Sequence, residues 1–174
     1  MKTKLNQSKL KFAIVSAMLV GSAGFSAAGY AATASDNMAV STTVAMSCTI
    51  SAQALTFSAY DPTSASNSDA TANIQSSCTA GGSVVITMGQ GGNAEASSTD
   101  SVPVRQMIGS GGNLGYAVYT DTDRLAVWGN TEATGNAFTA SGGLDTVVVY
   151  GRIPGSQSVG AGSFSDSVAV TLTY

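Results

Sequence analysis

The chain has 174 residues, which is enough for one ordinary domain and hardly for two. It is 44% hydrophobic and only 10% charged, with 20 Gly, two Cys and no His. This composition excludes charge-driven disorder, and the lack of His excludes Ser-His-Asp triads and His-ligated metal sites.

Charge is distributed unevenly along the chain. Four lysines lie within the first eleven residues, and no lysine follows Lys11. The rest of the chain carries all ten acidic residues and three arginines. A lysine-free acidic domain offers little to a phosphate backbone, so we expect no nucleic-acid partner.

The first 31 residues are predicted to form a signal peptide. A basic start, residues 1–11, precedes the apolar run Phe12–Gly24, which is short for a bilayer-spanning helix of about 20 residues. Small residues permit cleavage after residue 31 or after residue 34. We therefore expect export and no stable membrane insertion; an uncleaved membrane anchor is the alternative.

Both cysteines, Cys48 and Cys78, lie beyond this segment. An even pair in an exported chain predicts one disulfide in an oxidising compartment. A bridge that closes about 30 residues stabilises the fold by roughly 3–4 kcal/mol in the loop-entropy description. The Cys-x-x-Cys spacing typical of redox catalysis is absent from the sequence.

Beyond residue 35 the pattern is typical of short strands separated by turn residues. No sustained helical period is present, and we expect loops at Ser64–Thr71, Gly91–Asp100 and Gly109–Asn113. The segment Asp121-Thr122-Asp123 is expected to join two strands in a hairpin. The predicted strands are Thr49–Phe57, Ser83–Met88, Leu114–Thr120, Arg124–Trp128, Ala133–Ala140 and Thr146–Tyr150.

The final segment, Ser163–Tyr174, alternates most clearly. Its even positions are apolar except for Asp166, and its odd positions are small or polar. A period of two places one face inward and the other toward solvent. Many short strands with turns between them predict an all-β antiparallel sandwich.

A second alternating segment, Asp36–Ser47, precedes the first cysteine. One interpretation makes it the first strand of the chain's own sandwich. The other makes it a strand that joins the sheet of another subunit, using backbone hydrogen bonds and alternating side chains. Its inward-facing side chains would be Met38, Val40, Thr42, Val44 and Met46.

Several motifs occur together in the second half of the chain. One motif is Leu114–Asp121 (LGYAVYTD), followed by Arg124 and Trp128-Gly129. The others are Tyr150–Pro154 (YGRIP), Gly160–Asp166 (GAGSFSD) and the alternating end at Tyr174. Together they resemble the spore coat protein U-type domain, which is similar to the subunits of archaic chaperone–usher pili. The resemblance covers nearly all of the chain after the predicted signal peptide.

The resemblance implies an incomplete immunoglobulin-like sandwich that is completed by a donor strand from another subunit. Residues 32–46 would be the donor-strand extension and 47–174 the pilin domain. The acceptor groove would lie between the first core strand, after Cys48, and the C-terminal strand Phe164–Tyr174. Its C-terminal edge would include Phe164, Val168, Val170 and Leu172.

The resemblance also implies partners and a location. The partners are identical or related pilin subunits in a head-to-tail polymer, a periplasmic chaperone anchored at Tyr174, and an outer-membrane usher. The product would be an extracellular surface fibre, or fimbrium, that supports adhesion and biofilm formation. A secreted monomeric β-sandwich that binds a surface glycan or protein is the alternative.

Signals for enzyme chemistry are weak. Without His, and without Lys after the predicted signal peptide, a nucleophilic serine lacks its usual bases. Asp121 and Asp123 could contact a cation, but their setting favours a role in shaping a turn. We expect no enzymatic activity, no cofactor and no metal.

Overall fold

The computed structural model describes Gly29 and residues 31–174. The predicted signal peptide lies almost wholly outside the described residues. The described chain divides into the residues up to Ser41 and a domain, Thr42–Tyr174.

The domain is built from short strands, and the described residues contain no α-helix. A single turn of 3-10 helix, Glu132–Thr134, interrupts them. The strands are β1 (Cys48–Ala52), β2 (Ser68–Cys78), β3 (Ser83–Met88), β4 (Arg105–Gly109), β5 (Gly112–Tyr119), β6 (Asn136–Thr139), β7 (Leu144–Ile153), β8 (Phe164–Ser165) and β9 (Val170–Thr173).

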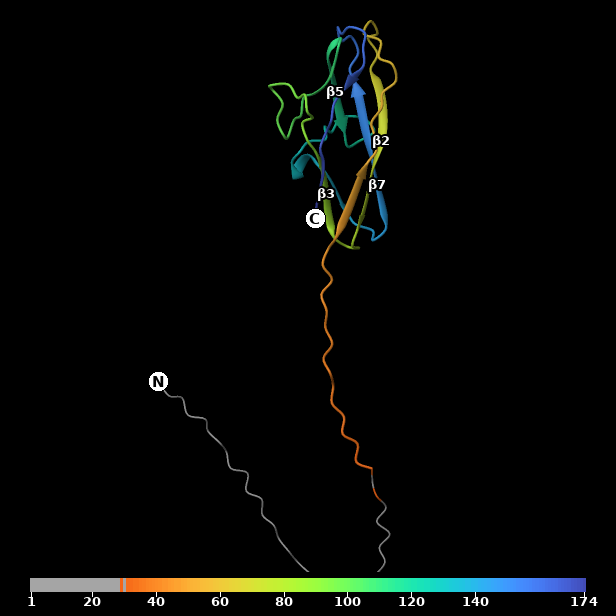
Figure 1. Ribbon diagram of the computed structural model, residues 1–174, viewed down its shortest axis with the longest axis vertical. Helices are drawn as coiled ribbons and strands as arrows, with labels where there is room; N and C mark the ends of the chain where they lie inside the picture. The colour runs from red at the N-terminus through yellow and green to blue at the C-terminus, as the bar shows by residue number, and fades with distance from the viewer. Residues whose placement is uncertain (1–28, 30) are drawn as a thin grey trace, which may run out of the picture. The chain divides into compact units, whose positions relative to one another are not determined.

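These strands form two antiparallel sheets. The larger has the order β1-β2-β7-β5-β4-β8, and the smaller has the order β6-β3-β9. The strands β2 and β7 run side by side along the domain (Figure 1), with Ala72 opposite Val149 and Ile74 opposite Val147. The prediction of an all-β antiparallel sandwich is confirmed.

Alternation within the strands separates the core from the solvent face. In β2 the even-numbered residues, among them Ile74, are buried or half-buried and face the second sheet, while Asp69, Thr71 and Ser77 are exposed. Trp128 is completely buried and its indole Nε1 donates a hydrogen bond to the Ile86 carbonyl at 2.8 Å. Because a buried indole needs an acceptor, this bond fixes the ring between the sheets.

Two strands were missed by the sequence pattern. The strand β2 begins at Ser68, inside the predicted loop Ser64–Thr71, and β4 was not predicted. The start of β2 is composed of Ser, Asp, Ala and Thr, which are common in turns, so composition favoured a loop. Pairing with Arg152 and Ile153 of β7 makes this stretch a strand.

Two predicted strands are wrong in detail. Residues Arg124–Trp128 form a loop with only an isolated bridge between Tyr119 and Val127. The predicted strand Ser163–Tyr174 is split into β8 and β9. It is interrupted around Asp166, whose carboxylate turns inward to accept hydrogen bonds from Tyr116 and from the backbone of Gly92.

The other predicted strands differ mainly in their ends. The first core strand stops at Ala52 and continues as coil to Phe57, whereas Ser83–Met88 is found as predicted. The predicted disulfide between Cys48 and Cys78 is confirmed. It joins directly opposed residues of β1 and β2.

The segment Asp36–Ser47 is not the first strand of this chain's own sandwich. Within the described residues, β1 begins at Cys48, and 32–47 form neither helix nor strand. The interpretation in which this segment completes its own sheet is therefore not supported by the fold.

Candidate functional site

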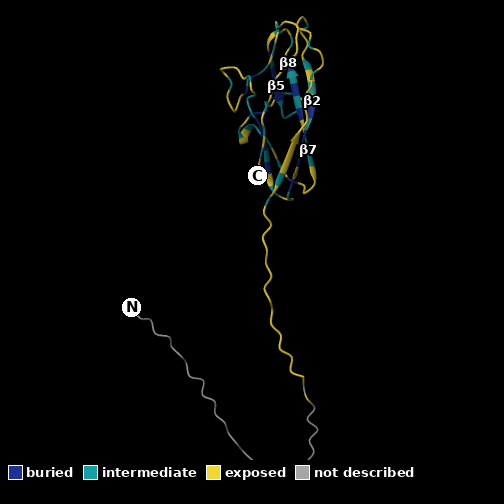
Figure 2. Cartoon of the chain, in the orientation of Figure 1, coloured by how far each residue is buried: buried dark blue, intermediate teal, exposed yellow. Residues whose placement is uncertain are grey.

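The segment before β1 presents apolar side chains to solvent. Met38 is 86% exposed, Val40 87% and Val44 80%. All residues from 36 to 45 are exposed, and Figure 2 shows this stretch in the colour of exposed residues. Three large apolar side chains exposed on one parity of a short segment are unusual for a soluble surface, and such exposure is common at interaction sites.

The segment ends where it meets the domain. Met46 is half-buried and packs with Cys48 against a small cluster formed by Cys78, Val84 and Ala140. The next residue, Ser47, is tied to Thr79 by two hydrogen bonds: the Ser47 N–H donates to Thr79 Oγ1, and the Thr79 N–H donates to the Ser47 carbonyl. Of the five predicted donor side chains, Met46 thus differs from the exposed Met38, Val40, Thr42 and Val44.

An open cavity of about 440 Å³ lies in the domain between two segments that are distant in sequence. One wall is the coil Leu55–Tyr60, which follows β1. The other wall is formed by Gly162 and residues Phe164–Asp166, which include β8. Its floor is formed by Met107, Leu114, Tyr116 and Ile153 from the larger sheet.

The first wall lies close against β7. A Cβ atom on Gly151 would overlap the ends of the Leu55 and Phe57 side chains, so these side chains pack directly on the glycine backbone. The Phe57 ring meets the Tyr116 ring edge to face, with centroids 6.5 Å apart. The Tyr60 hydroxyl donates to the Pro154 carbonyl and accepts from the Gln157 N–H, both at 2.9 Å.

The floor of the cavity carries one polar group. The Tyr116 hydroxyl donates to Asp166 Oδ2 at 2.7 Å, and Asp166 Oδ1 accepts from the Gly92 N–H and from Asn93 Nδ2. Burial, and secondarily the bond to Asp166, raises the pKa of Tyr116, which therefore stays protonated. Asp166 is the single interruption of the apolar face in the C-terminal segment, and these bonds explain its presence.

A buried arginine lies next to this pair. Arg105, opposite Tyr116 in the β4–β5 ladder, is 1% exposed. It donates to the carbonyls of Gly89, Met88 and Trp128 at 2.8–3.0 Å. Burial lowers its pKa, while the neighbouring Tyr116 and Asp166 oppose that shift. We assign Arg105 a structural role, because it holds together three segments around Trp128.

Two edge strands lie near the ends of the domain sequence. The strand β1 is an edge of the larger sheet and β9 is an edge of the smaller one. We call the region between these two edges the gap. Ile50 faces inward, opposite the buried Ser76, yet it is 38% exposed. An inward-facing residue stays exposed when the strand that would cover it is missing, so the edge of the sandwich is open beside β1.

The predicted C-terminal edge residues lie in β8, in β9 and in the coil between them. Phe164, Val168, Val170 and Leu172 are half-buried and all pack against the main core cluster. Leu172 also reaches the small cluster that Cys48 and Met46 contact. Tyr174, the predicted chaperone anchor, is 59% exposed.

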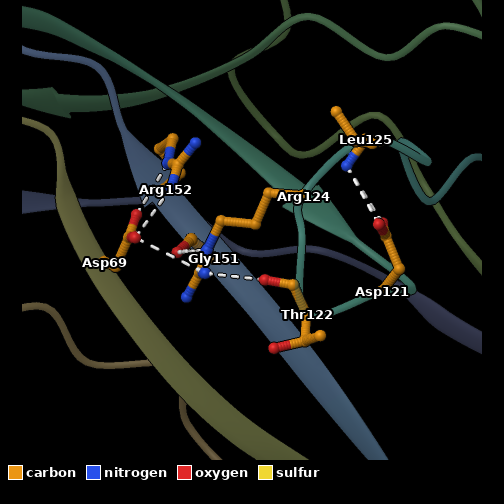
Figure 3. A network of polar contacts seen from close by, with 7 residues as sticks. All are labelled: Asp69, Asp121, Thr122, Arg124, Leu125, Gly151 and Arg152. Atoms are coloured by element: carbon orange, nitrogen blue, oxygen red, sulfur yellow. Dashed lines mark hydrogen bonds and ion pairs between the residues drawn. The ribbon is translucent and has the colours of Figure 1, made fainter.

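A polar network fixes the loop after β5 (Figure 3). Asp69 receives a bidentate bond from Arg152, at 2.8 Å to each oxygen, and lies 3.4 Å from Arg124 Nη1. These hydrogen bonds and charges lower the pKa of Asp69. Arg124 has a positive φ of 59° and lies over the Tyr150 ring, 5.8 Å from its centroid.

Asp121 shapes the turn in that loop, as its setting indicated. Its carboxylate accepts hydrogen bonds from the N–H groups of Leu125 and Ala126 at 2.8–3.1 Å. Within the described chain no group of three or more Cys, Asp or Glu side chains could hold a metal ion. No helix among the described residues is long and apolar enough to cross a membrane.

Sequence reasoning missed most of the cavity lining. The resemblance identified the C-terminal edge, but Tyr60, Met107 and the coil 55–60 were not assigned to a site. A loose alternation of Leu55 and Phe57 was the available signal. It was interpreted as a strand, whereas these residues form a wall over Gly151.

Comparisons with known proteins bear on this architecture. The family model described as Spore Coat Protein U domain matches residues 34–171. The chain belongs to this family. The match begins before β1, so the family domain includes the exposed segment as well as the sandwich.

One curated relative and one solved structure are similar to this Spore Coat Protein U chain. It is 38% identical over 155 residues to "Protein U" of Myxococcus xanthus, covering 83% of this chain and 87% of the relative. A solved structure from Acinetobacter baumannii, a pre-assembly complex of the chaperone CsuC and the tip adhesion subunit CsuE from archaic chaperone–usher Csu pili, contains a similar chain. That similarity has a TM-score of 0.53 at 17% identity, and covers 76% of this chain but 40% of that one. It establishes the sandwich fold that the resemblance implied.

Proposed function

We propose that this protein is a structural subunit of a chaperone–usher pilus, which polymerises when the N-terminal segment of one copy fills the open gap of the next. The observation that carries the proposal is the coexistence, in one chain, of an exposed alternating apolar segment and a sandwich with an uncovered inward face. The segment needs a partner that buries its apolar side chains, and the sandwich needs a strand that covers its inward face. The role is structural and involves no enzymatic chemistry.

The length and chemistry of the segment suit a donated strand. Nine residues of strand, 37–45, span about 30 Å at roughly 3.3 Å per residue. Each apolar side chain that becomes fully buried contributes about 1.5–3 kcal/mol before the cost of ordering the segment. Met38, Val40 and Val44 together can therefore hold two subunits tightly.

Insertion into the same chain is disfavoured by the residues that join the segment to β1. To lie beside its own β1, the segment would have to reverse direction just before Cys48. The strongest formers of tight turns are Gly, Asn, Asp and Pro, and residues 38–47 contain none of them. Ser47 is also held by Thr79, so the reversal cannot take place there.

Donation between different copies repeats the same asymmetric contact and does not close on itself. A heterologous contact of this kind generates a fibre. The open gap would expose apolar surface and unpaired edges before assembly, which is an aggregation hazard. A periplasmic chaperone that covers the gap and engages the exposed Tyr174 would remove it, and an outer-membrane usher would then receive the subunit. We propose a fibre on the cell surface that supports adhesion and biofilm formation.

The test uses the two faces of the segment in the full-length chain. Val40→Asp with Val44→Asp places charges on the apolar face, whereas Ser41→Asp with Thr43→Asp adds the same charge to the other face. Unheated samples from the secreting cells are separated in denaturing gels, and surface fibres are counted by electron microscopy. We expect a ladder of polymers and fibres from the control pair, and neither from the apolar-face pair.

Two results would contradict the proposal. One is equal assembly by both pairs, which would mean that the alternating face is not buried in the fibre. The other is the absence of any polymer from the unaltered chain, which would favour a monomeric sandwich that binds a surface glycan or protein.

A further inference from the structure

We propose that Met46 is not a donor side chain but a positioning residue, which locks the base of the N-terminal segment onto its own domain and makes the joint between successive subunits rigid. This inference rests on the proposed function, because it concerns how donor and acceptor are joined. Of the five alternating residues, four would bind in the neighbouring subunit, and Met46 would remain packed against its own domain.

The first argument is the space that Met46 occupies. A Cβ atom at Gly82 would overlap both Sδ and Cε of Met46, so the thioether lies directly on the glycine backbone. Gly82 is not in the left-handed region, so the missing side chain serves this contact and not the turn. The Gly82 carbonyl accepts a hydrogen bond from the Ala140 N–H at 2.9 Å, which keeps the turn between β2 and β3 in place.

The second argument is that the next two residues are also fixed. The Ser47 N–H and carbonyl are both bonded to Thr79, at 3.1 and 2.9 Å. Cys48 is covalently bonded to Cys78, opposite it in the β1–β2 ladder. Met46, Ser47 and Cys48 therefore form a continuous anchor, and the freely exposed segment ends at Ala45.

The third argument is exposure along the segment. Val44, two residues before Met46 and on the same face, is 80% exposed, whereas Met46 is half-buried. The side chains thus change from exposed to half-buried within two residues. One side chain cannot lie against its own Gly82 and fill a pocket of the neighbouring copy at the same time.

A rigid joint follows from this division. Val44 would be buried in the acceptor, Met46 packs against the donor's own domain, and only Ala45 lies between them. Consecutive Cα atoms are 3.8 Å apart, so two domains joined through one residue are nearly in contact. A linker this short lacks the flexibility of a longer coil. The turn Thr79–Gly82 of the donor would then face the end of the acceptor's groove.

The test compares variants of the full-length chain as assembled fibres. Two properties are measured: the persistence length of single fibres in electron micrographs, and the temperature at which fibres dissociate in detergent. For Met46→Ala and for Gly82→Ala, which displaces Met46 without removing it, we expect the persistence length to fall by roughly twofold or more as the joint loosens. Met46→Leu, which fills similar space, should restore stiffness.

Val44→Ala is the matched control on the donor face. It should lower the dissociation temperature by roughly 5 °C or more while leaving the persistence length unchanged. Gly82→Ala should do the reverse. A Gly82→Ala fibre as stiff as the unaltered one, or a Met46→Ala fibre that keeps its stiffness but dissociates as early as Val44→Ala, would overturn the positioning role. Failure of the proposed function is a separate outcome, because the unaltered chain would then form no detergent-resistant fibre.

Discussion

Asp166 is the residue on which the end of the open groove depends. It interrupts the apolar face of the C-terminal segment and joins Tyr116 of β5 to Gly92 and Asn93 of a distant loop. A charged residue in this position is tolerated because three donors surround it. Its removal would leave the hydroxyl of the buried Tyr116 and the Asn93 amide without this acceptor. The Gly92 N–H would keep its other bond, to the Ser167 carbonyl at 3.0 Å.

We therefore predict different costs for the two ends of this contact. Asp166→Ala should reduce the free energy of unfolding by about 1–3 kcal/mol, because donors are left unpaired. Tyr116→Phe should cost less, about 0.5–1.5 kcal/mol, because Asp166 keeps two donors. Chemical denaturation of the purified chain measures both values. The interpretation is wrong if Tyr116→Phe is the more destabilising of the two.

Four exposed or nearly exposed aspartates predict the acid sensitivity of the domain. The pKa values of Asp61, Asp69, Asp121 and Asp145 are all lowered from 3.8 by hydrogen bonds, which for Asp69 come from Arg152 and for Asp121 chiefly from the Ala126 N–H. A lowered pKa in the folded state stabilises the fold above the unfolded value. That stabilisation is lost as the pH falls through the lowered pKa.

The unfolding temperature should thus be nearly constant above about pH 5 and fall below about pH 4. Asp121→Asn should be less stable at neutral pH and should show a shallower decline in acid, because one of the four groups no longer titrates. Thermal unfolding from about pH 2 to about pH 7 measures how the unfolding temperature of each chain depends on pH. An unchanged acid slope in Asp121→Asn would show that the turn does not depend on the ionised carboxylate.

Among the elements, the strands that read clearly from sequence were those whose side chains alternate or cluster without interruption. Most residues of the strand Ser83–Met88 are buried, and the strand is found as predicted. The strand β2 was missed because its outward face is Ser, Asp, Thr and Asn, and its early inward residues are small. Pairing with β7, which is a property of the whole chain, makes it a strand.

At Arg124–Trp128 a strand was predicted where the structure has a loop. Its residues have strand-like composition, but the Asp121 carboxylate closes a turn and Arg124 adopts a positive φ to reach Asp69 and Gly151. Side-chain contacts of this kind are not visible in a pattern of hydrophobicity. The same holds for the cavity wall Leu55–Tyr60, which is coil and is positioned by Gly151 and Pro154.

The disulfide acts at the scale of elements, because it joins β1 to β2 at the base of the N-terminal segment. Replacing both cysteines, Cys48→Ser with Cys78→Ser, should lower the free energy of unfolding by roughly 3–4 kcal/mol through the freed loop of about 30 residues. Denaturation of the oxidised and reduced chains should give the same difference. If the free energy of unfolding falls by less than about 1 kcal/mol, the hydrogen bonds between β1 and β2 stabilise this end of the sheet without the disulfide.

At the scale of the whole molecule, the sequence and the family resemblance together indicated the sandwich, the disulfide and an N-terminal segment outside the core. They did not indicate that the five alternating residues differ. Met46 was grouped with Met38 by parity, and its partial burial and its contact with Gly82 separate the two residues. Alternation along a strand predicts the face on which a side chain lies. It does not predict whether that side chain packs against its own domain or against another copy.

The central claim is that residues 37–45 of one copy lie beside β9 of another copy, and intermolecular cross-linking tests it most directly. One set of chains carries Val40→Cys, Thr42→Cys or Val44→Cys, and a second chain, with a different mass tag, carries Val170→Cys. Cross-strand neighbours on one face have Cβ atoms about 4.5–5.5 Å apart, close enough for at least one register to form a bond after small adjustment.

The two chains are secreted together, oxidised, and analysed without reductant for the mass of the cross-linked species. We predict a disulfide between the two differently tagged chains for at least one of these positions, and none for the opposite-parity control Thr43→Cys. A bond that forms only when both cysteines are placed in the same chain, and never between two chains, would contradict the account.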